Sequence, residues 1–61
     1  MPIIHVTLVE GRDNDTVEEF IRRVARTAHE TLGAPMEAIK VMVDEVPKNR
    51  FATGDVLRSD E

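Results

Sequence analysis

The residues from Ile3 to Val9 form a run in which apolar side chains fall on both faces of a β-strand. Successive side chains of a strand point to opposite faces. One face carries Ile4, Val6 and Leu8, and the other carries Ile3, His5, Thr7 and Val9. A strand that is apolar on both faces is typical of a sheet that is covered on both sides. This need for two covering layers constrains the fold more than any other feature of the chain.

One amphipathic helix follows this strand. Asp13 and Asp15 are both candidate N-cap residues, and Asp15 with Glu18 has the spacing of a capping box. The apolar positions that follow keep to one helical stripe, namely Val17, Phe20, Ile21, Val24, Ala25, Ala28 and Leu32. Gly33 and Pro35 end the helix, because glycine accepts the left-handed conformation of a C-terminal cap and proline cannot continue the helix.

A second strand is predicted from Ala38 to Val46, with alternating apolar and polar residues. A strand, a helix and a strand within about 45 residues form a β-α-β unit, whose strands are parallel and joined by a right-handed crossover. The tail, 47–61, is polar and rich in turns, with short extended pieces at 51–53 and 56–57 around Gly54. We therefore predict an α+β fold in which 1–61 is a single domain that ends in a hairpin or turn segment.

The second covering layer must come from another chain. One helix covers one face of a sheet, and a domain of about 60 residues buries only about 60% of its unfolded surface. Small scaffolds compensate with disulfides, metals or partner subunits. There is no cysteine, and the two histidines, His5 and His29, lie in different predicted elements. With 41% apolar residues available, we expect an oligomer.

Charge and hydropathy exclude several partners. The net charge of −4 provides no basic surface for nucleic acid. The sequence has no run of 18 apolar residues and no basic-then-apolar leader, so we expect neither a membrane span nor a signal peptide. These features fit a cytoplasmic protein that binds neither nucleic acid nor membrane.

Pro2 is the main candidate for chemistry. Removal of Met1 would leave Pro2 as a chain terminus with a secondary amine, a base that no internal residue supplies. Proline also occupies this position in many proteins simply because it permits methionine removal. Three cations could surround the amine, namely Arg12, Lys40 and Arg50. We interpret His5, on a strand face, as an interface histidine in preference to a base.

The predicted topology separates these residues. If the two parallel strands are neighbours, Lys40 lies at the same end of the sheet as Pro2. Arg12 lies beyond the opposite end, because ten residues of strand span roughly 33 Å. A site that uses both Pro2 and Arg12 must then form between subunits. Phe51, in the tail, is either a plug on its own helix or an intersubunit contact.

The chain resembles the 4-oxalocrotonate tautomerase family over essentially its whole length. The likeness lies in an N-terminal Pro-Ile, a strand ending Leu-Val-Glu-Gly-Arg at 8–12, a helix closing Gly-Ala-Pro at 33–35, and a tail with Phe51. The resemblance implies β-α-β subunits assembled as a homohexamer, a trimer of dimers, with no cofactor or metal. It implies that Pro2 is a general base and that Arg12, from a neighbouring subunit, binds a substrate carboxylate.

Two further positions take their roles from the resemblance. Phe51 matches an aromatic residue in the hydrophobic wall of the site. Lys40 departs from the family, whose best-studied members have there a second arginine that binds the 2-oxo and carboxylate end of the substrate. Lysine keeps the charge but loses the bidentate fork. We therefore expect weaker or altered binding of a dicarboxylate.

The implied function is cofactor-independent enol–keto tautomerisation of a 2-hydroxydienoate or related 2-oxo acid. An apolar pocket with nearby cations lowers the pKa of an amine, which brings a general base closer to ambient pH. A hydratase-type 3-haloacrylate dehalogenase is an alternative that needs a carboxylate near Pro2, and the available ones are Asp44, Glu45 and Asp55. A non-catalytic hexameric binding protein, with Met1 retained, is the other alternative.

Overall fold

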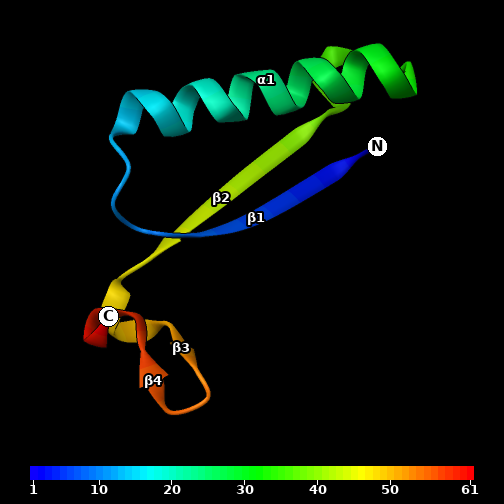
Figure 1. The fold of residues 1–61 in the computed structure, drawn as a ribbon. Coiled ribbons are helices and arrows are strands. Elements are labelled where there is room, and N and C mark those ends of the chain that lie inside the picture. The colour runs from blue at the N-terminus through cyan, green and yellow to red at the C-terminus, as the bar shows by residue number, and fades with distance from the viewer.

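A computed structural model describes all residues of the chain, Met1–Glu61. Strands β1 (Ile3–Val9) and β2 (Lys40–Val46) form a parallel two-stranded sheet, and helix α1 (Asn14–Leu32) connects them (Figure 1). Strands β3 (Ala52–Thr53) and β4 (Val56–Leu57) form an antiparallel hairpin. Short 3₁₀ turns occupy Met36–Ala38, Lys48–Arg50 and Arg58–Asp60. The predicted β-α-β unit and C-terminal hairpin are confirmed.

The register of the parallel ladder brings the starts of both strands together. Ile3 is the partner of Lys40 at one end, and Val9 is the partner of Val46 at the other. The backbone hydrogen bonds continue past both ends. The Lys40 N–H donates to the Pro2 carbonyl at 3.0 Å, and the Glu10 N–H donates to the Val46 carbonyl at 2.9 Å. The register therefore fixes which residue of β2 lies beside each residue of β1.

The second strand begins at Lys40, two residues later than the sequence pattern predicts. Met36–Ala38 instead forms a 3₁₀ turn, in which the Ala38 N–H donates to the Pro35 carbonyl at 3.0 Å. The Ile39 N–H donates to the Met36 carbonyl at 3.2 Å. These backbone groups are used within the turn, so they are not available to the ladder.

Helix α1 begins after Asp13, whose carbonyl accepts a hydrogen bond from the Val17 N–H at 3.3 Å. The Asp13 carboxylate accepts a hydrogen bond from the Thr16 hydroxyl. The capping box predicted for Asp15 and Glu18 is wrong, because Asp15 already lies inside the first turn. The helix ends at Gly33, in the left-handed region with φ of 74°, where its N–H donates to the His29 carbonyl at 3.1 Å.

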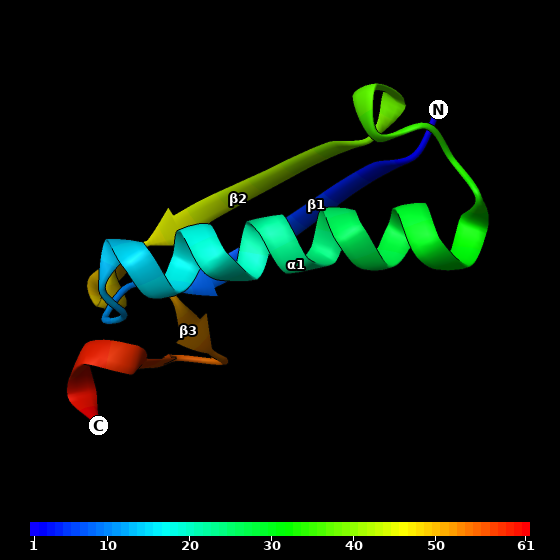
Figure 2. The ribbon, with the colours of Figure 1, turned by 90° about the horizontal axis from the view of Figure 1, so that it is seen from above.

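The helix covers one face of the sheet (Figure 2). Val17 and Ala28 on its inner side are the only buried residues of the chain. The outer side carries two exposed ion pairs, Arg22 with Glu18 at 3.7 Å and Arg23 with Glu19 at 2.8 Å. No helix of the chain combines the length and the hydropathy that crossing a bilayer requires.

The opposite sheet face is uncovered. It carries Ile3, which is 63% exposed, and Met42, which is 49% exposed. On the helix side the strand residues are half-buried, and these are Ile4, Val6, Leu8, Val41 and Val43. The predicted alternation and the uncovered apolar face are both confirmed.

The chain is less compact than a globular domain of its length. Its radius of gyration is 14.5 Å, whereas a compact domain of this length has about 10.5 Å. Its accessible surface is 4731 Å², against about 4,000 Å² for a compact monomer of this mass. The exposed side chains include the large apolar residues Ile3, Leu32 and Met42, and exposed apolar surface favours association with further copies.

The first prediction concerns this uncovered face. A glutamate at position 42 would be solvated in a lone chain and change its stability by at most about 0.5 kcal/mol. In an assembly that covers the face, an unpaired buried carboxylate costs several kcal/mol. We therefore expect Met42→Glu to dissociate or unfold the protein, while Met42→Leu keeps the native mass. Sedimentation equilibrium with circular dichroism tests this, and a Met42→Glu protein with unchanged mass and helicity contradicts it.

Candidate active site

Pro2 and Lys40 meet at the start of the sheet. Pro2 is half-buried and directly precedes β1, a position that tolerates its missing N–H, and its carbonyl accepts the Lys40 backbone N–H. The Lys40 side chain is exposed and makes no ion pair within the chain. Its one polar contact is from Nζ to the Glu37 carbonyl, at 3.5 Å. We call Pro2 and Lys40 the proline half-site.

Arg12 and Phe51 meet at the other end of the sheet. Gly11, with φ of 138°, turns the chain directly after β1, in a conformation that favours glycine. Arg12 then reaches back with Nη1 3.5 Å from the Val9 carbonyl and makes no ion pair. A hollow of about 520 Å³ has nine lining residues: Thr7, Leu8, Val9, Glu10, Gly11, Arg12, Lys48, Phe51 and Arg58. We call Arg12 and Phe51 the arginine half-site.

The two half-sites lie at opposite ends of one chain. Pro2 and Arg12 are ten residues apart on an extended strand, which spans roughly 33 Å. A substrate of a few carbon atoms cannot contact both residues of the same chain. The structure therefore brings Pro2 together with Lys40, and Arg12 together with Phe51, but it does not bring the four predicted residues into one place.

The structure rejects one of the two interpretations of Phe51. The hairpin extends beyond the strand ends and away from α1 (Figure 1). Phe51 lines the hollow beside β1 and its turn, and no residue of α1 lines that hollow. Phe51 is 40% exposed. The interpretation as a plug on its own helix is therefore wrong, because the polar tail turns outward at Pro47 instead of folding back.

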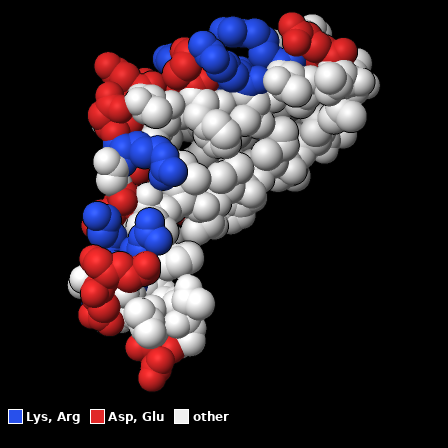
Figure 3. Space-filling model, viewed as in Figure 1, with Lys and Arg blue, Asp and Glu red and all other residues white.

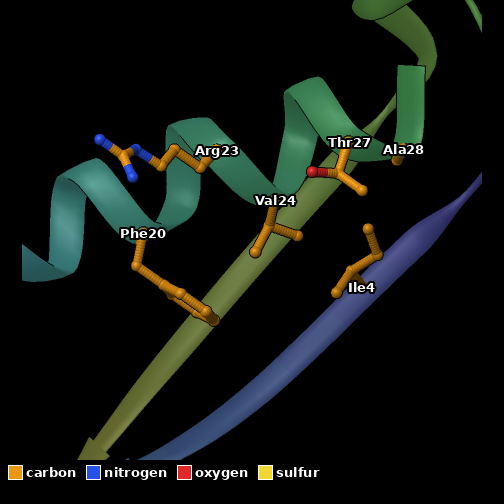
Figure 4. A pocket seen from close by; sticks show the side chains of 6 residues that line it. All are labelled: Ile4, Phe20, Arg23, Val24, Thr27 and Ala28. Atoms are coloured by element: carbon orange, nitrogen blue, oxygen red, sulfur yellow. The ribbon is translucent and has the colours of Figure 1, made fainter. Parts of the chain in front are cut away.

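A second hollow, of about 440 Å³, lies between α1 and β1. Figure 4 shows Phe20 and Val24 of α1 pointing toward Ile4 of β1, while the Arg23 side chain extends along the helix. The lining is mostly apolar and holds no carboxylate, histidine or amine that could move a proton. This hollow is an exposed part of the helix–strand contact, not a second reaction centre.

The tail contributes two other cations to this hollow. Arg50, the third cation considered for the surroundings of the Pro2 amine, donates from Nη1 to the Asn49 carbonyl at 3.1 Å and does not line the hollow. Lys48 and Arg58 line it instead. Sequence spacing carries no signal for Arg58, because only the reversal of the hairpin returns residue 58 to the neighbourhood of residue 51.

His5 already has a partner within the chain. Its Nε2 lies 2.6 Å from the Asp44 Oδ2, on the uncovered sheet face. The other carboxylates considered for water activation are also remote from Pro2. In the ladder Asp44 is level with Thr7 and Glu45 with Leu8, and Asp55 lies in the turn between β3 and β4. None of these three carboxylates lies at the Pro2 end of its own chain.

Comparison with known proteins adds evidence that is independent of this geometry. The family model for tautomerase enzymes matches residues 2–61. A probable tautomerase of Lactiplantibacillus plantarum is 39% identical over 61 residues, which are 100% of this chain and 95% of the relative. The 2-hydroxymuconate tautomerase of Pseudomonas sp. (strain CF600) is 39% identical over 54 residues, which are 88% of this chain and 86% of the relative.

Solved structures show the same fold. A 4-oxalocrotonate tautomerase homologue superposes with a TM-score of 0.91 at 39% identity, over 100% of this chain and 97% of the other. TomN, a 4-oxalocrotonate tautomerase homologue in the tomaymycin biosynthetic pathway, superposes with a TM-score of 0.89 at 41% identity, over 97% and 91%. Sequence and architecture agree over the full length, and the chain therefore belongs to the 4-oxalocrotonate tautomerase family.

Proposed function

We propose that this protein is a cofactor-independent enol–keto tautomerase of 2-hydroxydienoates or related 2-oxo acids, with Pro2 as its general base. The observation that carries the proposal is the pair of half-sites at opposite ends of one family chain. One has a proline at the chain start beside a free lysine, and the other has a free arginine beside an exposed aromatic ring. Together they supply a base, two anion ligands and an apolar wall.

The base requires removal of Met1. While Met1 is present, the Pro2 nitrogen is a tertiary amide without basicity. Once it is removed, the secondary amine belongs to a half-buried residue whose carbonyl accepts the Lys40 backbone N–H. Burial disfavours the protonated amine, and the charge of the Lys40 side chain would act in the same direction if it approaches the amine, so the pKa of the amine is expected to fall toward ambient pH. A general base is most effective in that range.

The reaction is then a proton shuttle along a conjugated chain. The Pro2 amine takes the proton of the 2-hydroxyl group, which breaks the O–H bond and leaves a dienolate. The same ammonium returns the proton to a carbon of the chain, which forms a C–H bond and leaves a 2-oxo acid. Lys40 stabilises the negative oxygen and the adjacent carboxylate, a preorganised electrostatic role. Arg12 of another subunit holds the far end, and Phe51 excludes water.

The proposed assembly is a homohexamer, a trimer of dimers, because each complete site needs two chains and the sheet face needs cover. A heterohexameric 4-oxalocrotonate tautomerase from Chloroflexus aurantiacus has a similar fold, with a TM-score of 0.88 at 22% identity. In such a closed assembly every Pro2 end can meet the Arg12 end of another copy, as heterologous contacts require.

The second prediction tests the base. We expect intact mass spectrometry to find the chain one methionine lighter than its translated mass. We expect Pro2→Ala to lower kcat/KM for 2-hydroxymuconate at least about 100-fold, since general base catalysis contributes 10²–10⁴-fold. Phenylenolpyruvate serves as a second substrate in the same ultraviolet assay. Processed protein that is inactive on both enols, or unaffected by Pro2→Ala, refutes the proposal.

The third prediction tests the division of the site between chains. Pro2→Ala and Arg12→Ala proteins should each be inactive alone. After joint denaturation and refolding in equal amounts, random assembly leaves roughly a quarter of the sites with both native residues if they come from different chains. We expect that share of wild-type activity to return. No recovery in mixed oligomers of native mass would mean that both residues act within one chain.

The fourth prediction concerns Lys40. An arginine restores the planar fork that binds a carboxylate through two parallel hydrogen bonds. We expect Lys40→Arg to lower KM for a dicarboxylate enol by about three- to tenfold, the effect of one additional charge-assisted hydrogen bond of roughly 1 kcal/mol. Steady-state kinetics measures this. An unchanged KM would show that Lys40 is not a substrate ligand.

Two other functions have less support from the geometry. A 3-haloacrylate dehalogenase needs a carboxylate that activates water beside Pro2, and Asp44, Glu45 and Asp55 all lie away from it within the chain. Halide release from 3-chloroacrylate would identify this activity. A non-catalytic hexameric binding protein would retain Met1, so the mass measurement separates it from the tautomerase.

A further inference from the structure

We infer that Lys48 and Arg58 are specificity-determining residues that bind, together with Arg12, the carboxylate at the end of the substrate remote from Pro2. This inference rests on the proposed function and deepens it. Its new part is the role of Lys48 and Arg58, which would hold the distal carboxylate in the hollow of the arginine half-site.

The two cations that line the hollow come from different segments of the tail. Lys48 opens the 3₁₀ turn that follows β2. Arg58 follows β4, and the β3–β4 pairing places Leu57 opposite Ala52, so the chain returns to its own starting point. The Arg58 N–H then donates to the Phe51 carbonyl at 2.7 Å. This backbone hydrogen bond anchors residue 58 beside the aromatic ring of the half-site.

The hollow has an excess of positive charge. Arg12 and Lys48 form no ion pair, and Arg58 has only an exposed partner, Glu61, at 3.8 Å. An exposed pair of this kind contributes little and leaves the cation available. Glu10 is the one carboxylate residue that lines the hollow. Glu45 lines an adjoining hollow together with Arg12 and Lys48.

Among the lining residues of this hollow, three cations face one carboxylate, which suits the hollow to an anion. Figure 3 shows Lys and Arg surfaces gathered between the sheet and the hairpin, with acidic surfaces beside them. Like charges held close together repel one another, and a bound carboxylate offsets that repulsion while it accepts charge-assisted hydrogen bonds. A hollow with these lining residues is expected to bind an anion more tightly than a neutral ligand of the same size.

The proline half-site has the opposite balance. Its single cation is Lys40, a point charge without a fork. The two ends of the substrate would therefore be bound by different numbers of cations, one near the reacting carbon and three at the distal carboxylate. A substrate without the distal carboxylate would lose its interactions with these three cations. The distal end would therefore determine the specificity for the substrate.

The experiment compares Arg58→Gln and Lys48→Gln with the wild type on two enols. One is 2-hydroxymuconate, and the other is 2-hydroxy-2,4-pentadienoate, which lacks the distal carboxylate. We expect each variant to raise KM for the dicarboxylate about tenfold, the effect of one lost charge-assisted contact, and to leave the monocarboxylate unchanged. Arg26→Gln removes a cation from the solvated face of α1 and serves as the matched control, without effect on either substrate.

A binding measurement separates this inference from the tautomerase proposal. Adipate is an unreactive dicarboxylate, and calorimetric titration of the assembled protein reports its affinity without any turnover. Weaker adipate binding by the Arg58→Gln and Lys48→Gln variants supports the inference even if no enol is converted. The inference is overturned if both variants, at native oligomer mass, bind adipate as the wild type does. Equal losses with both enols also overturn it.

Discussion

The ladder between β1 and β2 runs in parallel from the Ile3–Lys40 pair to the Val9–Val46 pair. Parallel pairing requires a crossover, and α1 supplies it across one face of the sheet. It also aligns the beginnings of the two strands at one end and their continuations at the other. A hairpin connection would have placed Lys40 near Val9 instead. The separation of the proline half-site from the arginine half-site is a direct consequence of this direction.

The same architecture leaves most of the chain exposed to solvent. With one helix and two strands, only Val17 and Ala28 are withdrawn from solvent. The uncovered face carries Ile3 and Met42, and the His5–Asp44 pair lies on the same face. Association of several chains would cover this face and would also bring the two half-sites together. Under the proposed assembly, the stability of the fold and the completeness of the site depend on the same contacts.

Much of this was accessible from residue patterns, because the signals were local. The helical stripe from Val17 to Leu32 and the two-faced run from Ile3 to Val9 each report periodicity, and periodicity follows from backbone geometry. The boundary errors were also local. The residue pattern predicts the second strand from Ala38 because β-propensity does not register the 3₁₀ turn at 36–38. It offers Asp15 as a cap residue because two acids lie near the start of the helix, of which Asp13 is the N-cap.

The sequence by itself determined the β-α-β order, the end of the sheet at which Pro2 and Lys40 meet, and the distance that separates Pro2 from Arg12. These depend on strand length and chain direction, which side-chain patterns encode. Only the tertiary structure decided which tail residues surround Arg12. Lys48 and Arg58 reach the hollow, and Arg50 does not, because the hairpin reversal and the Arg58–Phe51 backbone hydrogen bond set their positions. Such contacts join residues far apart along the chain, and no periodic pattern records them.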